Sequence, residues 1–157
     1  MDVVVSHAAA DFDSLGALVG ATRLYPNAVP VLTGGAGPLV REFLSLHREF
    51  VDPRACGDLL PEAIRRVIVV DTCRRRRIGP AAAWLELPGV EVHLYDHHVE
   101  EECDLPVTQA RVERWGAASS ILADCLRSLG RTPTPFEATA MLLGIYEDTG
   151  SLSFAGT

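Results

Sequence analysis

The sequence predicts an α/β fold with a doubly wound, mostly parallel sheet flanked by helices. Short apolar runs alternate with longer segments in which apolar residues recur every three or four positions, as expected for alternating strands and helices. Three consecutive valines at residues 3–5 are typical of a strand that is covered on both faces. Several runs end in acidic residues or histidines, and open α/β sheets carry their chemistry at these carboxyl ends.

The first half of the chain predicts two β-α units. A strand at residues 2–6 is followed by apolar residues with helical spacing over 15–24, and the Pro-Asn pair at 26–27 ends that helix. A short strand is expected at 29–32. The glycine-rich segment at 34–38 then introduces a second helix.

The second half begins with a weak pattern and becomes clearer along the chain. Residues 50–61 are poorly patterned, and we expect one helical turn to start at Pro61. The remaining expected elements are a strand at 67–70, a short helix at 79–87, a strand at 90–95, and helices at 116–129 and from 135 to about 145.

Composition indicates one globular domain over residues 1–157. The 157 residues are 48% hydrophobic and 22% charged, which is ordinary for a globular protein with a real core. The chain has 21 acidic residues against 14 lysines and arginines, a formal net charge of −7. This balance argues against a general electrostatic grip on nucleic acid but leaves room for a local basic patch. Because the sequence stops soon after a functional-looking acidic cluster, we expect an N-terminal fragment of a longer multidomain protein.

The sequence also predicts a cytoplasmic protein without a membrane partner. No apolar run approaches the ~20 residues that are needed to cross a bilayer. The first residues lack the pattern of a signal peptide, and the four cysteines form no CxxC pair. A reducing compartment is therefore expected.

Four segments place possible metal ligands at the ends of apolar runs. They carry His7 with Asp11 and Asp13, then Asp71, then Asp96 with His97 and His98, and finally Asp148. Because the carboxyl ends of parallel strands meet at one edge of a sheet, these side chains could converge although they are far apart in sequence. Carboxylates mixed with imidazoles suit Mn²⁺, and also Co²⁺, Fe²⁺ or Zn²⁺, with manganese or magnesium as the first expectation. The absence of cysteine ligands argues against a structural zinc.

The number of acids predicts two metal ions. Four carboxylates within ~5 Å of one another repel by roughly 3 kcal/mol per pair at an effective dielectric constant of ~20. Two divalent ions would balance the four charges, and Asp71, which is central in the set, would bridge them.

Each segment also has a purely structural alternative. Asp11 and Asp13 could cap the first helix, and the Asp-Thr pair at 71–72 could form a simple turn. The tripeptide at 96–98 could be a polar strand end, and Asp148 could end a helix, where a negative charge is electrostatically unfavourable. Together the four segments favour a metal site more than any one of them does.

The four segments, in this order, resemble the signature of the DHH phosphoesterase superfamily. That superfamily includes RecJ-like exonucleases, family II inorganic pyrophosphatases, exopolyphosphatases, and phosphodiesterases of oligonucleotides or cyclic dinucleotides. The resemblance covers the motifs at 7–16, 70–72, 96–98 and 148–150. It implies that one ion is held by His7, Asp11 and Asp71, and the other by Asp13, Asp71, His97 and Asp148. It also implies that Asp96 and His98 are catalytic, with Asp96 supporting the site and His98 facing the substrate phosphate.

A segment of small residues at 116–120 resembles the part of the family that follows the third motif. Its backbone amides and hydroxyls could meet a phosphate at the positive end of a helix. The residues expected to contact substrate are His98, Ser119, Ser120 and Thr149. Close helix packing by these small residues is an equally open alternative.

The function that the resemblance implies is two-metal hydrolysis of a phosphodiester or phosphoanhydride in a nucleotide, an oligonucleotide or a polyphosphate. The chain is similar to the N-terminal DHH domain of long bacterial tRNA nucleotidyltransferase-like proteins, which also carry CBS domains and a poly(A) polymerase-like head. The expected partners are a phosphate-containing small molecule or nucleic-acid end, and downstream domains of the same protein. Active family members use a second domain that closes over the metals, so residues 1–157 alone should show weak or no hydrolysis. The alternative is a non-hydrolytic, metal-dependent regulatory domain that binds a nucleotide or RNA.

Other charged residues are expected to lie mostly outside the site. The four arginines at 74–77 either face solvent or attract a phosphate, with solvent favoured, and the acidic segment at 100–104 should be a solvated loop. His47 and His93 have no acidic partner at ligand spacing and are expected to be structural or surface residues.

Overall fold

Six strands form one parallel sheet in a computed structural model that describes residues 1–154. The strands are β1 (Asp2–Val5), β2 (Ala28–Leu32), β3 (Arg54–Ala55), β4 (Arg66–Val70), β5 (Glu91–Asp96) and β6 (Gln109–Val112). Their spatial order is β3-β2-β1-β4-β5-β6, and every neighbouring pair is parallel. The chain winds outward from β1 to β3 and then returns to place β4 beside β1. This reversal is the position at which open α/β sheets bind their ligands.

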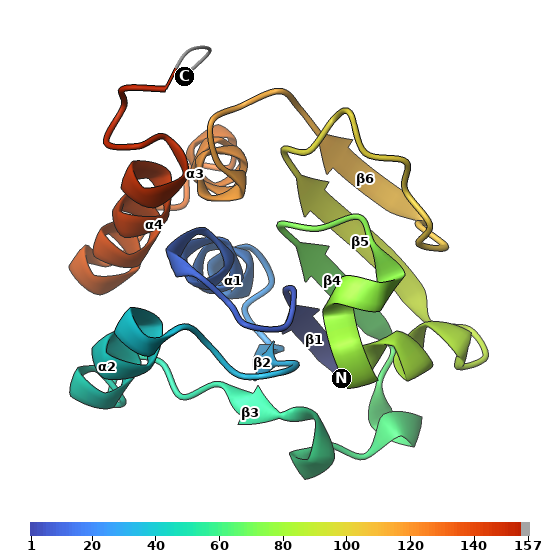
Figure 1. Cartoon of the computed structure of the whole chain (residues 1–157). Coiled ribbons are helices and arrows are strands. Elements are labelled where there is room, and N and C mark those ends of the chain that lie inside the picture. The colour runs from blue at the N-terminus through green and yellow to red at the C-terminus, as the bar shows by residue number, and fades with distance from the viewer. Residues whose placement is uncertain (155–157) are drawn as a thin grey trace.

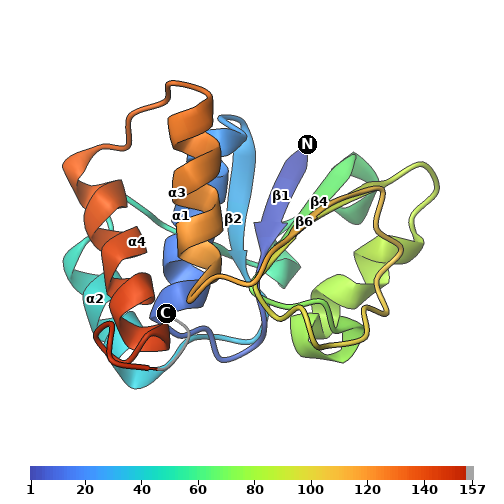
Figure 2. The ribbon, with the colours of Figure 1, turned by 90° about the horizontal axis from the view of Figure 1, so that it is seen from above.

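Helical segments cover both faces of the sheet, which confirms the doubly wound α/β fold (Figures 1 and 2). The four α-helices lie on one face; they are α1 (Phe12–Leu24), α2 (Pro38–Leu46), α3 (Ala118–Ser128) and α4 (Pro135–Asp148). The other face is covered by a 3₁₀ segment at Arg75–Glu86, which is interrupted at Gly79. Two short 3₁₀ turns at Cys56–Asp58 and Pro61–Ala63 lead into β4.

The valines of the central strands alternate between two apolar cores. Val3 and Val5 pack with Trp84 under the 3₁₀ segment, whereas Val4 packs with Leu18 of α1 on the opposite face. All three valines are fully buried. The continuous apolar run of β1 is thus explained by a strand that has both faces covered.

Both edge strands differ from the sequence-based expectation. The segment around β3 was expected to be irregular, and β6 was not expected at all. β3 has two residues and β6 reads Gln-Ala-Arg-Val, so neither carries the apolar run by which buried strands are recognised. The helix expected at 79–87 belongs to the 3₁₀ segment Arg75–Glu86, and α4 runs on to Asp148 rather than ending near residue 145. The expected end of the domain at residue 157 lies outside the described residues.

Two glycines allow the helices next to the sheet to pack closely. A Cβ atom on Gly16 of α1 would lie 2.5 Å from Ser119 Oγ, and one on Gly144 of α4 would lie 2.7 Å from the Cα atom of Asp13. Contacts this short are not tolerated by a larger residue without movement of its neighbours. The C-terminal end of α4 is further tied to the start of α1, because the Phe12 N–H donates to the carboxylate of Glu147 at 2.5 Å. The first turn of α1 and the last turn of α4 are therefore held at one place.

Candidate metal centre

Six side chains from four separate segments meet at the carboxyl edge of the central strands. They are His7 after β1, Asp11 and Asp13 at the start of α1, Asp71 after β4, His97 after β5, and Asp148 at the end of α4. The segments that carry His7, Asp71 and His97 follow β1, β4 and β5, so the sheet brings them to one edge, while α4 reaches the same edge through its packing on α1.

Asp71 lies at the middle of this group. Its Oδ2 atom is 3.3 Å from His7 Nε2, and its Oδ1 atom is 3.4 Å from His97 Nε2. The Ser14 hydroxyl donates to Oδ2 at 2.7 Å and fixes the carboxylate. Asp71 has a φ of 60°, in the left-handed region where aspartate is tolerated better than most residues. The two oxygens of one carboxylate thus face two different histidines.

The first of two ligand groups contains His7, Asp11 and Asp71. His7 Nε2 lies 3.4 Å from Asp11 Oδ2, and its Nδ1 atom is 2.9 Å from the Ala8 carbonyl oxygen, which orients the ring. Asp11 is also the N-cap of α1, since its Oδ1 atom accepts the Ser14 N–H at 2.9 Å. The capping role and the place beside His7 are therefore compatible, because each uses a different carboxylate oxygen.

The second group contains Asp13, Asp71, His97 and Asp148. His97 Nε2 lies 3.2 Å from Asp148 Oδ2 and 3.9 Å from Asp13 Oδ2, while its Nδ1 atom is 3.1 Å from the Trp115 carbonyl oxygen. That carbonyl fixes the ring and leaves Nε2 facing the carboxylates, an arrangement that is common for histidines that bind metals.

The donor set fits divalent cations. In each group the ligand atoms, carboxylate oxygens and imidazole nitrogens, all lie within 4.8 Å of one another. His97 Nε2 is buried and makes no hydrogen bond of acceptable geometry in the described part of the chain. A buried polar atom without a partner is rare in folded proteins and is explained if it binds an ion. The groups contain the same residues as the two ligand sets expected from the sequence.

The neighbouring carboxylates favour the protonated form of the two histidines in this cluster. Burial alone would lower the pKa of His7, but the carboxylates of Asp11 and Asp71 raise it to about 10. Burial likewise opposes protonation of His97, yet Asp148, Asp71 and Asp13 raise its pKa to about 11. Without metal, the two histidines thus carry the positive charge that balances the acids.

The pKa values of the two central acids, Asp13 and Asp71, are shifted in opposite directions. Burial and the nearby charge of Asp71 raise the pKa of Asp13 to about 7. For Asp71, the nearby imidazoles of His7 and His97 and the hydrogen bond from Ser14 outweigh burial and hold its pKa well below the usual range. Asp71 is therefore the carboxylate that remains ionised.

Asp96 and His98 form a separate pair beside the cluster. Asp96 is fully buried, and its Oδ1 atom lies 2.7 Å from His98 Nδ1 and accepts the N–H of His97 at 2.8 Å. Hydrogen bonding to Asp96 raises the pKa of His98. The two residues also lie close enough to Asp71 and His97 to form a third possible ligand group. Because Asp96 Oδ1 already serves His97 and His98, we assign Asp96 to support of the cluster.

Of the residues expected to contact substrate, Ser119 is buried against a protein acid, whereas Ser120 and Thr149 line a groove. Ser119 is fully buried, its N–H donates to Asp13 Oδ1 at 2.9 Å, and its hydroxyl donates to the Asp13 carbonyl at 3.3 Å. The N-terminus of α3 therefore binds a protein carboxylate, and at Ser119 the structure favours the packing alternative. Ser120 and Thr149 line a groove next to the cluster. The sequence analysis did not predict the hydrogen bond from Ser14 to Asp71, because the two residues are 57 positions apart and no motif links them.

Two arginines of the 74–77 run and the two remaining histidines have local partners. Arg74 pairs with Glu101 at 3.2 Å, and Arg75 pairs with Glu86 at 2.5 Å, so half of the arginine run is neutralised by protein acids. His47 stacks on the ring of Phe43, and His93 Nδ1 lies 2.7 Å from the Tyr25 hydroxyl. Neither histidine belongs to the metal-ligand groups found among residues 1–154.

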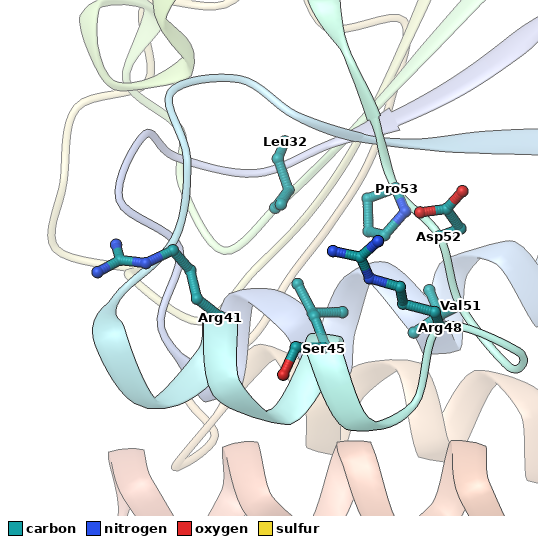
Figure 3. Close-up of a pocket in the computed structure, with 8 residues that line it drawn as sticks. Leu32, Arg41, Ser45, Arg48, Val51, Asp52 and Pro53 are labelled. Atoms are coloured by element: carbon teal, nitrogen blue, oxygen red, sulfur yellow. The ribbon is translucent and has the colours of Figure 1, made fainter.

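A separate pocket of about 320 Å³ lies along α2 and the segment that follows it (Figure 3). It is lined by Leu32, Arg41, Leu44, Ser45, Arg48, Val51, Asp52 and Pro53. In Figure 3 the guanidinium of Arg48 extends toward Asp52 and Pro53, whereas that of Arg41 points away from them. None of the six candidate metal ligands lines this pocket, so we place the chemistry at the carboxyl edge of β1, β4 and β5.

No helix within residues 1–154 combines the length and the apolar character that a membrane span requires.

The chain matches known proteins along nearly its whole length. Two A-adding tRNA nucleotidyltransferases resemble it in sequence: one from Geobacter sulfurreducens is 39% identical over 158 residues, and one from Aquifex aeolicus is 29% identical over 165 residues. They align with 100% and 99% of this chain, which spans only 18% of the length of each relative. The crystal structure of an exopolyphosphatase-related protein from Bacteroides fragilis shares the fold with a TM-score of 0.75 and 17% identity, over 99% of this chain and 48% of that chain. The family model described as the N-terminal domain of the DHH family matches residues 3–145, and the chain therefore belongs to the DHH family.

Proposed function

We propose that the chain is a metal-dependent phosphoesterase domain that hydrolyses a phosphodiester or phosphoanhydride in a nucleotide, an oligonucleotide or a polyphosphate. The observation that carries this proposal is the position of Asp71, whose two oxygens lie 3.3 Å from His7 and 3.4 Å from His97. A carboxylate shared in this way is what a two-metal site requires. Membership of the DHH family supports the same class of reaction.

The candidate ligands form two sets that share Asp71. His7, Asp11 and Asp71 would hold one ion, and Asp13, Asp71, His97 and Asp148 would hold the second. Two bound Mn²⁺ ions, with Mg²⁺ or Co²⁺ as alternatives, would withdraw charge from the phosphoryl oxygens and lower the pKa of water.

His98 is the candidate for contact with the substrate phosphate. Asp96 holds its Nδ1 atom at 2.7 Å and raises its pKa, which favours the cationic form of the imidazole. Its side chain remains 31% exposed, which leaves Nε2 able to donate to a phosphoryl oxygen. Asp96 thus acts as a positioning residue for His98.

The relatives support a second candidate, a regulatory domain that binds a nucleotide or RNA through the same metals without hydrolysing it. The chain spans 18% of each of two proteins that are named tRNA nucleotidyltransferases. If it is one domain of such a protein, downstream domains would be its partners. A cytoplasmic location fits the four free cysteines.

Single-turnover hydrolysis separates the two candidates. The chain, loaded with Mn²⁺ and in excess over substrate, is incubated with pyrophosphate, short oligonucleotides and cyclic dinucleotides, and products are followed over hours. From residues 1–157 alone we expect weak or no cleavage, with a clear gain in a longer chain that includes the downstream domain, and loss of any cleavage in Asp71→Asn and in His98→Ala. A longer chain that carries its metals and binds these ligands yet cleaves none would overturn the hydrolytic proposal in favour of the regulatory one.

A further inference from the structure

An aromatic groove opens beside the candidate metal centre, between α3 and α4. It is lined by Arg114, Trp115, Gly116, Ser120, Ile145, Thr149 and Leu152 and has a volume of about 340 Å³. A second hollow of about 450 Å³ continues it along α3 and shares Trp115, Ser120 and Ile145. Volumes of this size are typical of sites for small molecules.

The groove is joined directly to the metal ligands. The Trp115 carbonyl oxygen lies 3.1 Å from His97 Nδ1, and Thr149 follows the ligand Asp148 in the chain. At the start of α3, the Ala118 N–H donates to Asp13 Oδ2 at 2.7 Å. A molecule with its phosphate at the metal cluster would therefore have the groove as an adjoining apolar surface.

The Trp115 side chain is free to contact such a molecule. Only its backbone carbonyl serves His97, and within residues 1–154 the indole makes no hydrogen bond. The residue is 41% exposed, in contrast to Trp84, which is 4% exposed in the core. The Ser120 hydroxyl, in the same groove, is likewise without a hydrogen bond in the described residues. The groove therefore offers an open aromatic face with two unused polar groups at its side.

We propose that this groove binds the base of a nucleotide whose phosphate lies at the metal cluster, with the base stacked on Trp115. This inference rests on the proposed function and names its substrate class. Bases stack on exposed aromatic side chains through their π-faces, largely independently of sequence, and the indole N–H and the Ser120 hydroxyl can serve polar edges of the base.

The charges of the groove favour a base over a further phosphate. Arg127 is paired with Asp124 at 2.5 Å, and Arg114 is paired with Glu100. Asp124 also accepts Arg111 at 2.6 Å, so the lining carries no arginine without an acidic partner. An extended polyphosphate would meet Ile145 and Trp115 without a free cation, which is unfavourable for an anion. The groove is therefore better suited to the base of a nucleotide than to an extended polyphosphate.

Binding of matched ligands tests the proposal. AMP and CMP are titrated into the chain loaded with Mn²⁺, and ribose 5-phosphate and pyrophosphate serve as ligands without a base. We expect the nucleotides to bind roughly tenfold or more tightly than ribose 5-phosphate. Trp115→Ala should remove this difference and leave ribose 5-phosphate binding unchanged, whereas Trp115→Phe should retain most of it. Leu39→Ala, which removes an exposed apolar side chain on α2, serves as the matched control.

Tryptophan fluorescence gives a second readout that a purely structural role would not change. In the wild-type chain, nucleotides should quench the fluorescence of Trp115. In Trp115→Phe, in which Trp84 is the one remaining tryptophan, nucleotides should leave the emission unchanged. Equal affinity for AMP and ribose 5-phosphate, or equal quenching in both proteins, would overturn the groove while leaving the phosphoesterase proposal in place. Failure of the metal-loaded chain to bind any of the four ligands would instead reject the proposed function and the groove with it.

Discussion

The carboxylate of Asp13 on α1 accepts the backbone N–H of Ser119 at the start of α3, 106 positions along the chain, at 2.9 Å. The Ser119 hydroxyl returns a hydrogen bond to the Asp13 carbonyl at 3.3 Å. A negative charge at the N-terminus of a helix is favourable, because the unpaired N–H groups and the helix dipole both stabilise it. Here the helix N-terminus stabilises the carboxylate of a candidate metal ligand, so α3 holds Asp13 in place within the cluster.

Gly144→Ala should disturb this arrangement from the opposite side. The added Cβ would lie 2.7 Å from both the Asp13 Cα atom and Ser119 Oγ, so α4 must move away from α1. We expect a loss of roughly 1–3 kcal/mol of unfolding free energy, as for overpacked cores, together with weaker Mn²⁺ binding. Chemical denaturation and titration calorimetry measure the two effects. Gly57→Ala is the control, since its Cβ would meet no atom within 4 Å; equal behaviour of the two variants would contradict the prediction.

Asp71→Asn should impair both ligand groups at once. The substitution keeps the shape of the side chain but removes the charge that faces His7 and His97. We expect about two Mn²⁺ ions per wild-type chain and a loss at both sites in Asp71→Asn, whereas Asp11→Asn should weaken one site only. Elemental analysis after gel filtration gives the metal content. The exposed Glu42→Gln changes the net charge equally and should keep both ions; full metal content in Asp71→Asn would rule out the shared carboxylate.

Removal of metal should lower the thermal stability of the fold. Mn²⁺ binds the native cluster, so mass action stabilises the chain by about 2.7 kcal/mol for one site at a hundredfold excess over Kd. For a domain of this size the corresponding increase in Tm is roughly 5–10 °C. Melting curves with chelator and after addition of Mn²⁺ measure this shift. Asp71→Asn should melt at the same temperature in both conditions, and a wild-type Tm indifferent to metal would mean that the cluster binds none.

The proximity of the candidate ligands and the fold class could be predicted from the sequence for the same reason. His7, Asp71 and His97 each follow a buried strand, and a parallel sheet brings the ends of its strands to one edge. The edge strands could not be predicted, because β6 has exposed residues and is defined by pairing with β5 rather than by its own pattern.

The partner of the α3 N-terminus could not be predicted either. The small residues at 116–120 indicate a helix start with free N–H groups, and this pattern fits a substrate phosphate as well as a protein acid. Only the packing of α1 against α3 reveals that the anion is Asp13. For the same reason the groove at Trp115, which is formed by side chains from two helices and a loop, has no signature in the sequence.

Metal binding should release protons, and its affinity should rise with pH. In the metal-free fold the pKa values of His7 and His97 are raised to about 10 and about 11, above the ordinary value of 6.5. The stability contributed by these two imidazolium groups is present below about pH 6.5 and is lost as the pH rises through 10 and 11. A metal ion binds only the neutral imidazole, so at pH 7 each histidine must give up a proton. Asp13, with a pKa of about 7, adds a fraction of a third proton.

Titration calorimetry in buffers of different ionisation enthalpy counts these protons. We expect roughly two to three protons to be released per chain at pH 7, and the Mn²⁺ affinity to increase steeply between pH 6 and 8. His7→Gln should reduce the count by about one, because the group that competes with metal is then absent. His47→Gln, which alters a histidine stacked on Phe43 outside the metal-ligand groups, should leave the count unchanged. A binding enthalpy that is the same in every buffer would show that the histidines are already neutral in the metal-free protein, and the acids would then have to be balanced by other charges.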